Sequence, residues 1–249
     1  MSSPARILIS IIGHLAEAPR PQKEAGALVR AGHEVMIRGT WWDHDRAAED
    51  LELAKSLGVD FAPLVDLRKK SKTALKSRLK RRLAVELYQK FGWVTARSFG
   101  HSGPEIVAET KRLRPDLVIV HAEDGLWAGR KLLNKGFRIG VDFEDWFSED
   151  LMPEARRRRP VSALAAVEKF LLKHATYCQT TTKVMAKAMS MKAKAERIPL
   201  AIPNVFPWSD RAHIEQHKSD ERGDEVSFYW VSQTIGPGRG LEILAQALR

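Results

Sequence analysis

The sequence contains a single cysteine, Cys178, and lacks any long uninterrupted apolar segment. One thiol excludes a disulfide within the chain, which favours a reducing compartment such as the cytoplasm. The apolar run at residues 7–12 is too short to span a bilayer, and its flanks do not form a signal peptide. We therefore expect a cytoplasmic protein, and any contact with a membrane would be peripheral, on its inner face.

Acidic residues are scarce relative to basic ones, since 31 Asp and Glu face 41 Lys and Arg, for a net charge of +10. Such an excess predicts attraction to an anionic partner, which can be a nucleic acid, a phosphate-bearing substrate or an acidic membrane surface. The length of 249 residues and a hydrophobic content of 44% are enough for one large domain or two smaller ones.

Segments rich in Ile, Val and Leu alternate with helical patterns along most of the chain. The predicted strands lie at residues 6–12, 34–38, 60–65, 117–121, 138–142, 176–179 and 196–202. This alternation predicts an α/β fold: a Rossmann-like parallel sheet with helices on both faces. Because ligands of such sheets bind beyond the carboxyl ends of the strands, the residues after each strand are the candidates for a site.

A change of composition predicts a domain boundary near residue 203. Pro199, Pro203 and Pro207 punctuate the chain, and residues 209–224 are almost wholly polar. We predict a domain at residues 1–203, a linker at 204–224 and a strand–loop–helix unit at 225–249. Such a unit cannot bury its own apolar face.

The stretch from Lys69 to Arg82 contains eight basic residues and no acidic one. Leucines and a phenylalanine recur every fourth position, at Leu75, Leu79, Leu83, Leu87 and Phe91. One interpretation is a helix whose apolar stripe packs on the sheet and whose basic face is solvated. The other is a helix that docks on anionic lipid. Nucleic acid is a weaker alternative, because no aromatic residue is interleaved in the basic run.

Two groups of candidates follow the first and fourth strands. After the first, Gly13 allows a close backbone approach, and His14, Arg20 and Lys23 are candidates for binding an anion or an acceptor. The loop has no G-x-G-x-x-G pattern, so a dinucleotide site loses its main support. After the fourth strand, the candidates are His121, Glu123 and Asp124, although Asp124 could instead cap a helix.

The stretch "VDFEDWFSED" after the fifth strand carries Glu144 and Asp145. Carboxylates at a strand end can accept hydrogen bonds from sugar hydroxyls or act as acid and base, and here we favour function over solvated loop charge. No regular ligand spacing indicates a metal, and we expect none. Near the end of the chain, Gly236, Gly238, Arg239 and Gly240 form a glycine-rich turn before a helix, which is typical of a phosphate site and also of ordinary turns.

Taken in order, these stretches resemble the retaining, nucleotide-sugar-dependent glycosyltransferases of family four, which have the two-domain GT-B architecture. The resemblance is carried by "PRPQKEAGALVRAGHEVMI", "DLVIVHAEDG", "VDFEDWFSED", "EKFLLKHATYCQTTTKVMAKAM", "IPNVF" as the hinge and "FYWVSQTIGPGRGLEILAQAL" as the first unit of the donor domain. It implies that residues 1–203 form the acceptor-side domain and that the donor domain is represented only by its first unit.

Site residues also follow from the resemblance. Arg239 matches a position that contacts the donor diphosphate, Gly13 matches a loop that closes near it, and Asp145 matches an acidic position beside the reacting sugar. The family commonly has histidine in place of Glu123 and Glu144. The implied partners are a nucleoside-diphosphate sugar as co-substrate, with no other cofactor, and a saccharide or lipid-linked acceptor.

Two hypotheses therefore come from the sequence. The first is a glycosyltransferase whose residues 1–249 alone are inactive, because the rest of the donor domain is needed. The second is a non-catalytic, Rossmann-like binding protein that docks on an anionic membrane or on nucleic acid through its basic helix.

Overall fold

The computed structural model describes residues 3–68, 71–150, 153–206, 208–209, 211, 228–230 and 240–248. The chain divides into two compact units, Met1–Asn204 and Val205–Arg249, and each is considered by itself. Most of the predicted linker and most of the predicted phosphate turn, including Gly236, Gly238 and Arg239, lie outside the described residues.

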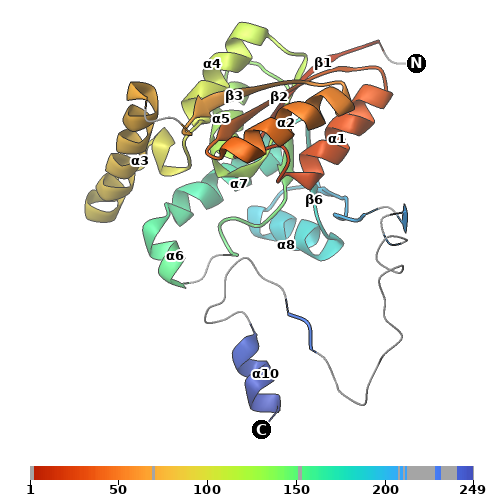
Figure 1. Ribbon diagram of the computed structural model, residues 1–249. Helices are drawn as coiled ribbons and strands as arrows, with labels where there is room; N and C mark the ends of the chain where they lie inside the picture. The colour runs from red at the N-terminus through yellow and green to blue at the C-terminus, as the bar shows by residue number, and fades with distance from the viewer. Residues whose placement is uncertain are drawn as a thin grey trace. The chain divides into compact units, whose positions relative to one another are not determined.

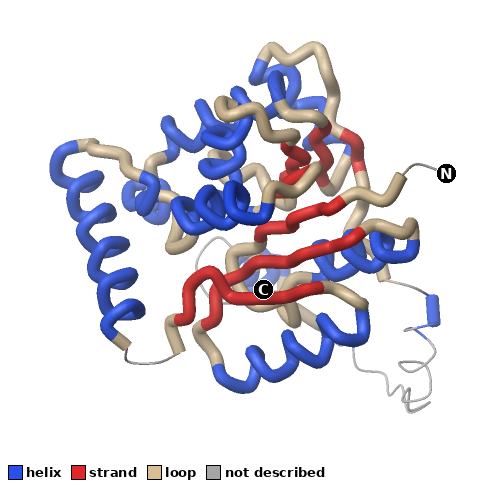
Figure 2. The backbone as a smooth tube through the Cα atoms, turned by 90° about the horizontal axis from the view of Figure 1, so that it is seen from above, coloured by secondary structure: helices blue, strands red, loops and turns tan. Residues whose placement is uncertain are grey.

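The first unit is built on one parallel sheet of seven strands in the order β3-β2-β1-β4-β5-β6-β7 (Figures 1 and 2). Its strands are β1 (Arg6–Ser10), β2 (Glu34–Trp41), β3 (Asp60–Asp66), β4 (Leu117–Val120), β5 (Ile139–Phe143), β6 (Tyr177–Thr180) and β7 (Leu200–Ala201). Every neighbouring pair is parallel. The predicted α/β class with a Rossmann-like sheet is confirmed.

Helices cover both faces of this sheet. They are α1 (Pro19–Arg30), α2 (His44–Leu57), α3 (Lys72–Phe91), the 3-10 turn η1 (Ala96–Ser98), α4 (Gly103–Leu113), α5 (Ala122–Leu133), α6 (Pro153–Arg158), α7 (Val161–His174) and α8 (Lys183–Ala193). Each strand from β1 to β6 is followed by a helical connection to the next strand, as parallel pairing requires.

Alternation along the strands creates two apolar layers. Ile7 and Ile9 of β1 point to the layer that contains buried residues of α1 and α2, whereas Leu8 points to the layer under α4, α5, α7 and α8. Successive side chains of a strand face opposite sides, so both faces of the central strands are buried and both must be apolar.

The basic helix α3 lies apart from the main layers and packs on η1, α6 and β3 (Figure 1). Ser71 caps its start by accepting a hydrogen bond from the N–H of Ala74, and Gly92 ends it in the left-handed region with φ of 68°. Its buried residues are Ala74, Ser77 and Ala84.

The leucine stripe of α3 faces solvent. Leu75, Leu79 and Leu83 are 66%, 63% and 55% exposed. The interpretation in which this stripe packs on the sheet is therefore wrong. Small side chains, rather than the leucines, fill the close contact between α3 and the body of the unit.

The second unit is described only in part. Residues 228–230 have no regular secondary structure, and the helix α10 (Leu241–Ala247) has no buried residue. Gly240 precedes α10 with φ of 92°, a conformation that glycine adopts without strain.

Candidate functional site

The strand order reverses between β1 and β4, and the candidate site lies at this reversal. The chain first proceeds from β1 through β2 to β3 on one side, then continues from β4 to β7 on the other. Ser10 and Val120 are partners at the carboxyl ends of β1 and β4. The helices that follow these two strands, α1 and α5, pack on opposite faces of the sheet. Such a reversal is where doubly wound sheets commonly bind ligands.

His121, the first residue after β4, is held between carboxylates from two directions. Its Nε2 lies 3.0 Å from Glu24 of α1, and its Nδ1 lies 3.1 Å from Glu144, just after β5. Both acceptors are carboxylates, so both ring nitrogens donate and the ring is an imidazolium. Burial opposes this charge, but the bonds to Glu144 and Glu24 outweigh it and raise the pKa of His121 to about 10.

The backbone after His121 is strained. Ala122 has φ of 57°, in the left-handed region that costs a residue with a Cβ about 1 kcal/mol. This turn places His121 at the N-cap of α5 while its ring points toward α1 and β5. Strain of this kind persists where the surroundings fix the conformation, and it is common at functional sites.

Arg20 joins the same group from the first turn of α1. Its guanidinium forms a bidentate pair with Asp142 of β5, at 2.9 and 2.8 Å, and a 2.6 Å bond to the carbonyl of Ile202. Glu24, one helical turn later, accepts a 3.0 Å hydrogen bond from Gln179 of β6. We call Arg20, Glu24, His121, Asp142 and Glu144 the charged cluster.

The charged cluster contains three carboxylates and two cations. Burial raises the pKa of Asp142. Burial acts on Glu144 in the same direction, but the bond to His121 outweighs it and lowers the pKa of Glu144. Asp142 is almost fully buried, whereas the Glu144 side chain is 29% exposed. Glu144 is therefore the most exposed of the three carboxylates in the charged cluster.

Asp145 extends this edge into solvent. It is exposed, and its pKa is raised by partial burial of the carboxyl and by the neighbouring charge of Glu144. The two adjacent carboxyls thus differ in their environment: Glu144 is ion-paired with His121, and Asp145 is not. Such a pair can accept hydrogen bonds from hydroxyl groups and stabilise positive charge that develops on a sugar.

Three residues of the cluster, His121, Asp142 and Glu144, also place metal-ligand atoms within 4.8 Å of one another. Both oxygens of Asp142 already bind Arg20, and His121 carries a proton on each nitrogen. A metal ion would have to displace these cations, so the donor set does not favour one.

The other two carboxyls predicted after β4 face the interior. Glu123 forms an ion pair with Arg159, and Asp124 accepts bonds from the hydroxyl and the N–H of Ser102 at 2.5 and 3.2 Å. Burial raises the pKa of both carboxyls. Glu123 is 5% exposed and Asp124 is 1% exposed. Both side chains therefore anchor α5 to its neighbours and are closed to a substrate.

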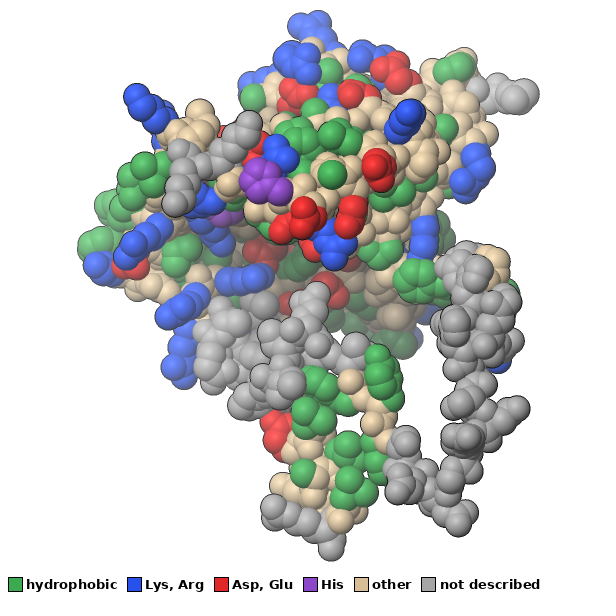
Figure 3. Space-filling model, in the orientation of Figure 1, with side chains coloured by type: hydrophobic (Ala, Val, Ile, Leu, Met, Phe, Trp, Pro, Cys, Tyr) green, Lys and Arg blue, Asp and Glu red, His purple; other side chains and the backbone are tan. Residues whose placement is uncertain are grey.

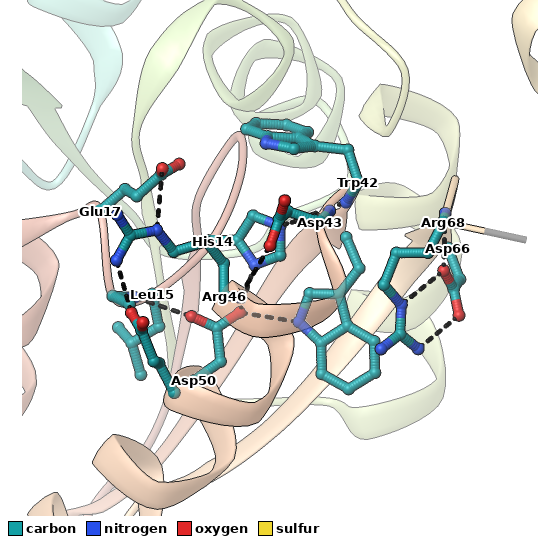
Figure 4. Close-up of polar contacts among 12 residues, drawn as sticks. His14, Leu15, Glu17, Trp42, Asp43, Arg46, Asp50, Asp66 and Arg68 are labelled. Atoms are coloured by element: carbon teal, nitrogen blue, oxygen red, sulfur yellow. Dashed lines mark hydrogen bonds and ion pairs between the residues drawn. The ribbon is translucent and has the colours of Figure 1, made fainter.

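His14 is likewise internal (Figure 4). Its Nδ1 lies 2.8 Å from Asp50, and its Nε2 accepts bonds from the backbone N–H groups of Trp42 and Asp43. With both nitrogens engaged and the side chain buried, His14 fixes the loop after β1. A Cβ at position 13 would lie 2.3 Å from the far edge of the half-exposed Trp42 ring, so a larger residue than Gly13 would require that ring to shift.

Lys23 is exposed on α1 and donates a 3.0 Å bond to the side chain of Asn204. Together with the bond from Arg20 to Ile202, this fixes the last residues of the first unit against α1. Arg20, Lys23, His121 and Glu144 were predicted from the sequence, whereas Glu24, Asp142 and Gln179 were not. The signal for Glu24 was its position four residues after Arg20, on the same face of α1.

The fold and this cluster define a Rossmann-like α/β unit with a polar site at its strand-order reversal. No protein-family model matches the chain, and the comparison with curated proteins finds no match. Among solved structures, similar ones are two UDP-GlcNAc 2-epimerases and a glycosyltransferase.

The epimerase from Methanocaldococcus jannaschii is 11% identical with a TM-score of 0.46, over 86% of this chain and 54% of that one. The epimerase from Neisseria meningitidis, bound to UDP-GlcNAc, is 12% identical with a TM-score of 0.45, over 85% and 50%. A Streptomyces glycosyltransferase complexed with thymidine diphosphate is 17% identical with a TM-score of 0.38, over 74% and 51%. The chain spans about half the length of these proteins, and the scores assign no activity.

Proposed function

We propose that the chain is the acceptor-side part of a glycosyltransferase that uses a nucleoside-diphosphate sugar and retains the configuration of the transferred sugar. The observation that supports this most is the charged cluster at the reversal of strand order, with Glu144 and Asp145 at its accessible edge. The resemblance of the ordered sequence stretches supplies the reaction class.

In this proposal each part of the cluster has its own task. Glu144, kept ionised by His121, accepts hydrogen bonds from hydroxyls of the sugar or the acceptor. Arg20 and Glu24 are positioning residues, because they hold Asp142 and His121 in place. On the donor side, Arg239 and the N–H groups of the glycine-rich turn stabilise the charge of the leaving diphosphate.

The test uses the reading frame of this chain, expressed to its stop codon and incubated with UDP-, GDP- and dTDP-sugars and saccharide or lipid-linked acceptors. We expect a glycoside whose anomeric configuration is that of the donor sugar. The NMR coupling constant between the anomeric carbon and its proton measures this configuration. Glu144→Gln should lower kcat by roughly 100-fold, which is the scale of a lost catalytic carboxylate. Glu149→Gln, an exposed change in the same loop, should leave it unchanged.

Three results would contradict the proposal. They are the absence of any nucleotide-sugar consumption, a product of inverted configuration, and an epimerised nucleotide sugar in place of a glycoside.

A further inference from the structure

The outward face of α3 is an apolar ridge between two rows of cations. Leu75, Leu79 and Leu83 recur every four residues and form the ridge, directly opposite the buried Ala74, Ser77 and Ala84. At 3.6 residues per turn, Arg78 and Arg82 fall along one side of the ridge and Lys76 and Lys80 along the other. All four of these cations are exposed.

The helix is fixed in this orientation by its inner side. Arg78 donates to the carbonyl of Leu67, and Arg81 donates to the carbonyl of Arg97, so side chains that border the buried face bind the body of the unit. The exposed leucines are therefore not the result of a helix detached from its core. They are held outward by contacts that small residues and these arginines make.

More cations and aromatic rings lie on α6 and at the C-terminal end of α3. The helix α6, which packs on α3, carries Arg157 and Arg158 as exposed residues, and Figure 3 shows apolar and basic side chains gathered on this side of the unit. Phe91 and Trp93, both more than 60% exposed, contact each other at the end of α3, with ring centroids 5.4 Å apart. Exposed tryptophan beside a basic apolar face is typical of a membrane–water interface.

We propose that α3 is a docking surface for an anionic lipid bilayer, lying in the plane of the headgroups with its leucine ridge toward the acyl chains. The charge pattern selects this partner, because cations on both sides of the ridge reach lipid phosphates while the leucines leave water. On a nucleic acid the same cations would bind, but the leucines would meet a polyanion. Within the described residues, none of the helices has the length and apolar character of a membrane span, so the contact is one of surface docking. This inference does not depend on the proposed activity.

The test is flotation of the full chain with phosphatidylcholine vesicles that contain none or 30% phosphatidylglycerol. Binding is expected only with the anionic lipid and should weaken as salt is raised. Replacing Lys76, Lys80 and Arg82 by Gln should lower the partition coefficient about 100-fold, at about 1 kcal/mol for each charge. The matched control replaces three exposed lysines on other elements, Lys55, Lys111 and Lys135, by Gln, and should lower it far less.

A second set of variants separates insertion from charge attraction. Leu75, Leu79 and Leu83 changed to Gln keep every charge and should still lower binding roughly tenfold or more. The control changes Leu51, Val184 and Met191, which are exposed on α2 and α8, to Gln. An environment-sensitive dye on Leu79→Cys, with Cys178 buried and unreactive, should shift to the blue on vesicles, and the same dye on Leu51→Cys should not.

The proposal is overturned if the leucine variants bind vesicles as well as the wild type, or if neutral and anionic vesicles bind equally. It is also overturned if the chain ignores vesicles but binds duplex DNA or RNA through the same lysines in a gel shift.

Discussion

The imidazole of His121 has a carboxylate against each nitrogen, and its protonation sets the charge of the whole site. Its folded pKa of about 10 lies above the unfolded value of 6.5. The resulting stabilisation is complete below about pH 6.5 and is lost as the pH rises through about 10. The Hε1 resonance of His121 should therefore stay at its imidazolium position between pH 5 and 8.

His121→Gln leaves buried carboxylates without their cation and should lower the free energy of unfolding at pH 7 by about 3 kcal/mol. The difference from the wild type should narrow as the pH approaches 10. His44→Gln, on the exposed start of α2, serves as the control and should change little in urea unfolding. A His121 resonance that titrates near pH 6.5 would contradict the charged assignment.

Glu168 is a second buried carboxyl, in α7, and accepts both the N–H and the hydroxyl of Ser148. Burial, with help from Asp150 and Glu149, raises its pKa to about 7. The pKa of Glu168 is about 7 in the folded protein and 4.5 in the unfolded chain. Its contribution to the free energy of unfolding is therefore complete below about pH 4.5 and is lost as the pH rises through about 7.

Urea unfolding of the wild type and Glu168→Gln between pH 4 and 8 tests this. The wild type should lose about 2–3 kcal/mol relative to the variant over that range. Parallel stability curves would show that the carboxyl titrates normally.

The rule that ligands bind beyond the carboxyl ends of parallel strands identified residues such as His121 and Glu144. It could not identify Asp142, because an acidic residue inside a strand gives no sign of the arginine that it meets from a helix 122 residues away in the sequence. Nor could it separate Glu144 from Glu123, since both follow a strand and only the packed structure buries one against Arg159.

At the scale of the element, α3 shows that the spacing of apolar residues does not determine whether their side chains face the core or the solvent. The four-residue spacing of the leucines predicted a single stripe, and the stripe exists. Its direction depends on Ala74, Ser77 and Ala84, whose small size allows the closest approach to the body of the unit.

This orientation predicts opposite results for two substitutions. Leu79→Gln should change the free energy of unfolding by no more than about 0.5 kcal/mol, as exposed changes do. Ala84→Leu should lower it by about 1–3 kcal/mol, because the contact has no room for a larger side chain. Chemical denaturation of the two variants checks this. A large loss of unfolding free energy in Leu79→Gln would show that the ridge is packed in the core.

At the scale of the whole molecule, the sheet and both of its apolar layers lie within Met1–Asn204. The alternation of strands and helices was enough to predict this sheet, because nearly continuous apolar runs mark strands buried on both faces. The prediction for residues 225–249 as the start of a second domain stays a prediction.

A chain of residues 1–204 should unfold with the same urea midpoint and slope as the full chain, because it keeps the complete sheet. In the full chain, amides of α10 should exchange orders of magnitude faster than those of β1 and β4, since a seven-residue helix without buried residues is marginal. Exchange by mass spectrometry tests both statements. Equal protection of α10 and the sheet would contradict the second.

The bonds from Arg20 to Ile202 and from Lys23 to Asn204 have a mechanical consequence. They pin the exit of the first unit to α1, so the polypeptide beyond residue 204 starts from a fixed pivot. A pull on that segment loads the bond between Lys23 and Asn204 first and then the bond from Arg20 to Ile202. Arg20 passes the load to Asp142 of β5. The candidate site and the exit of the first unit therefore share the side chain of Arg20.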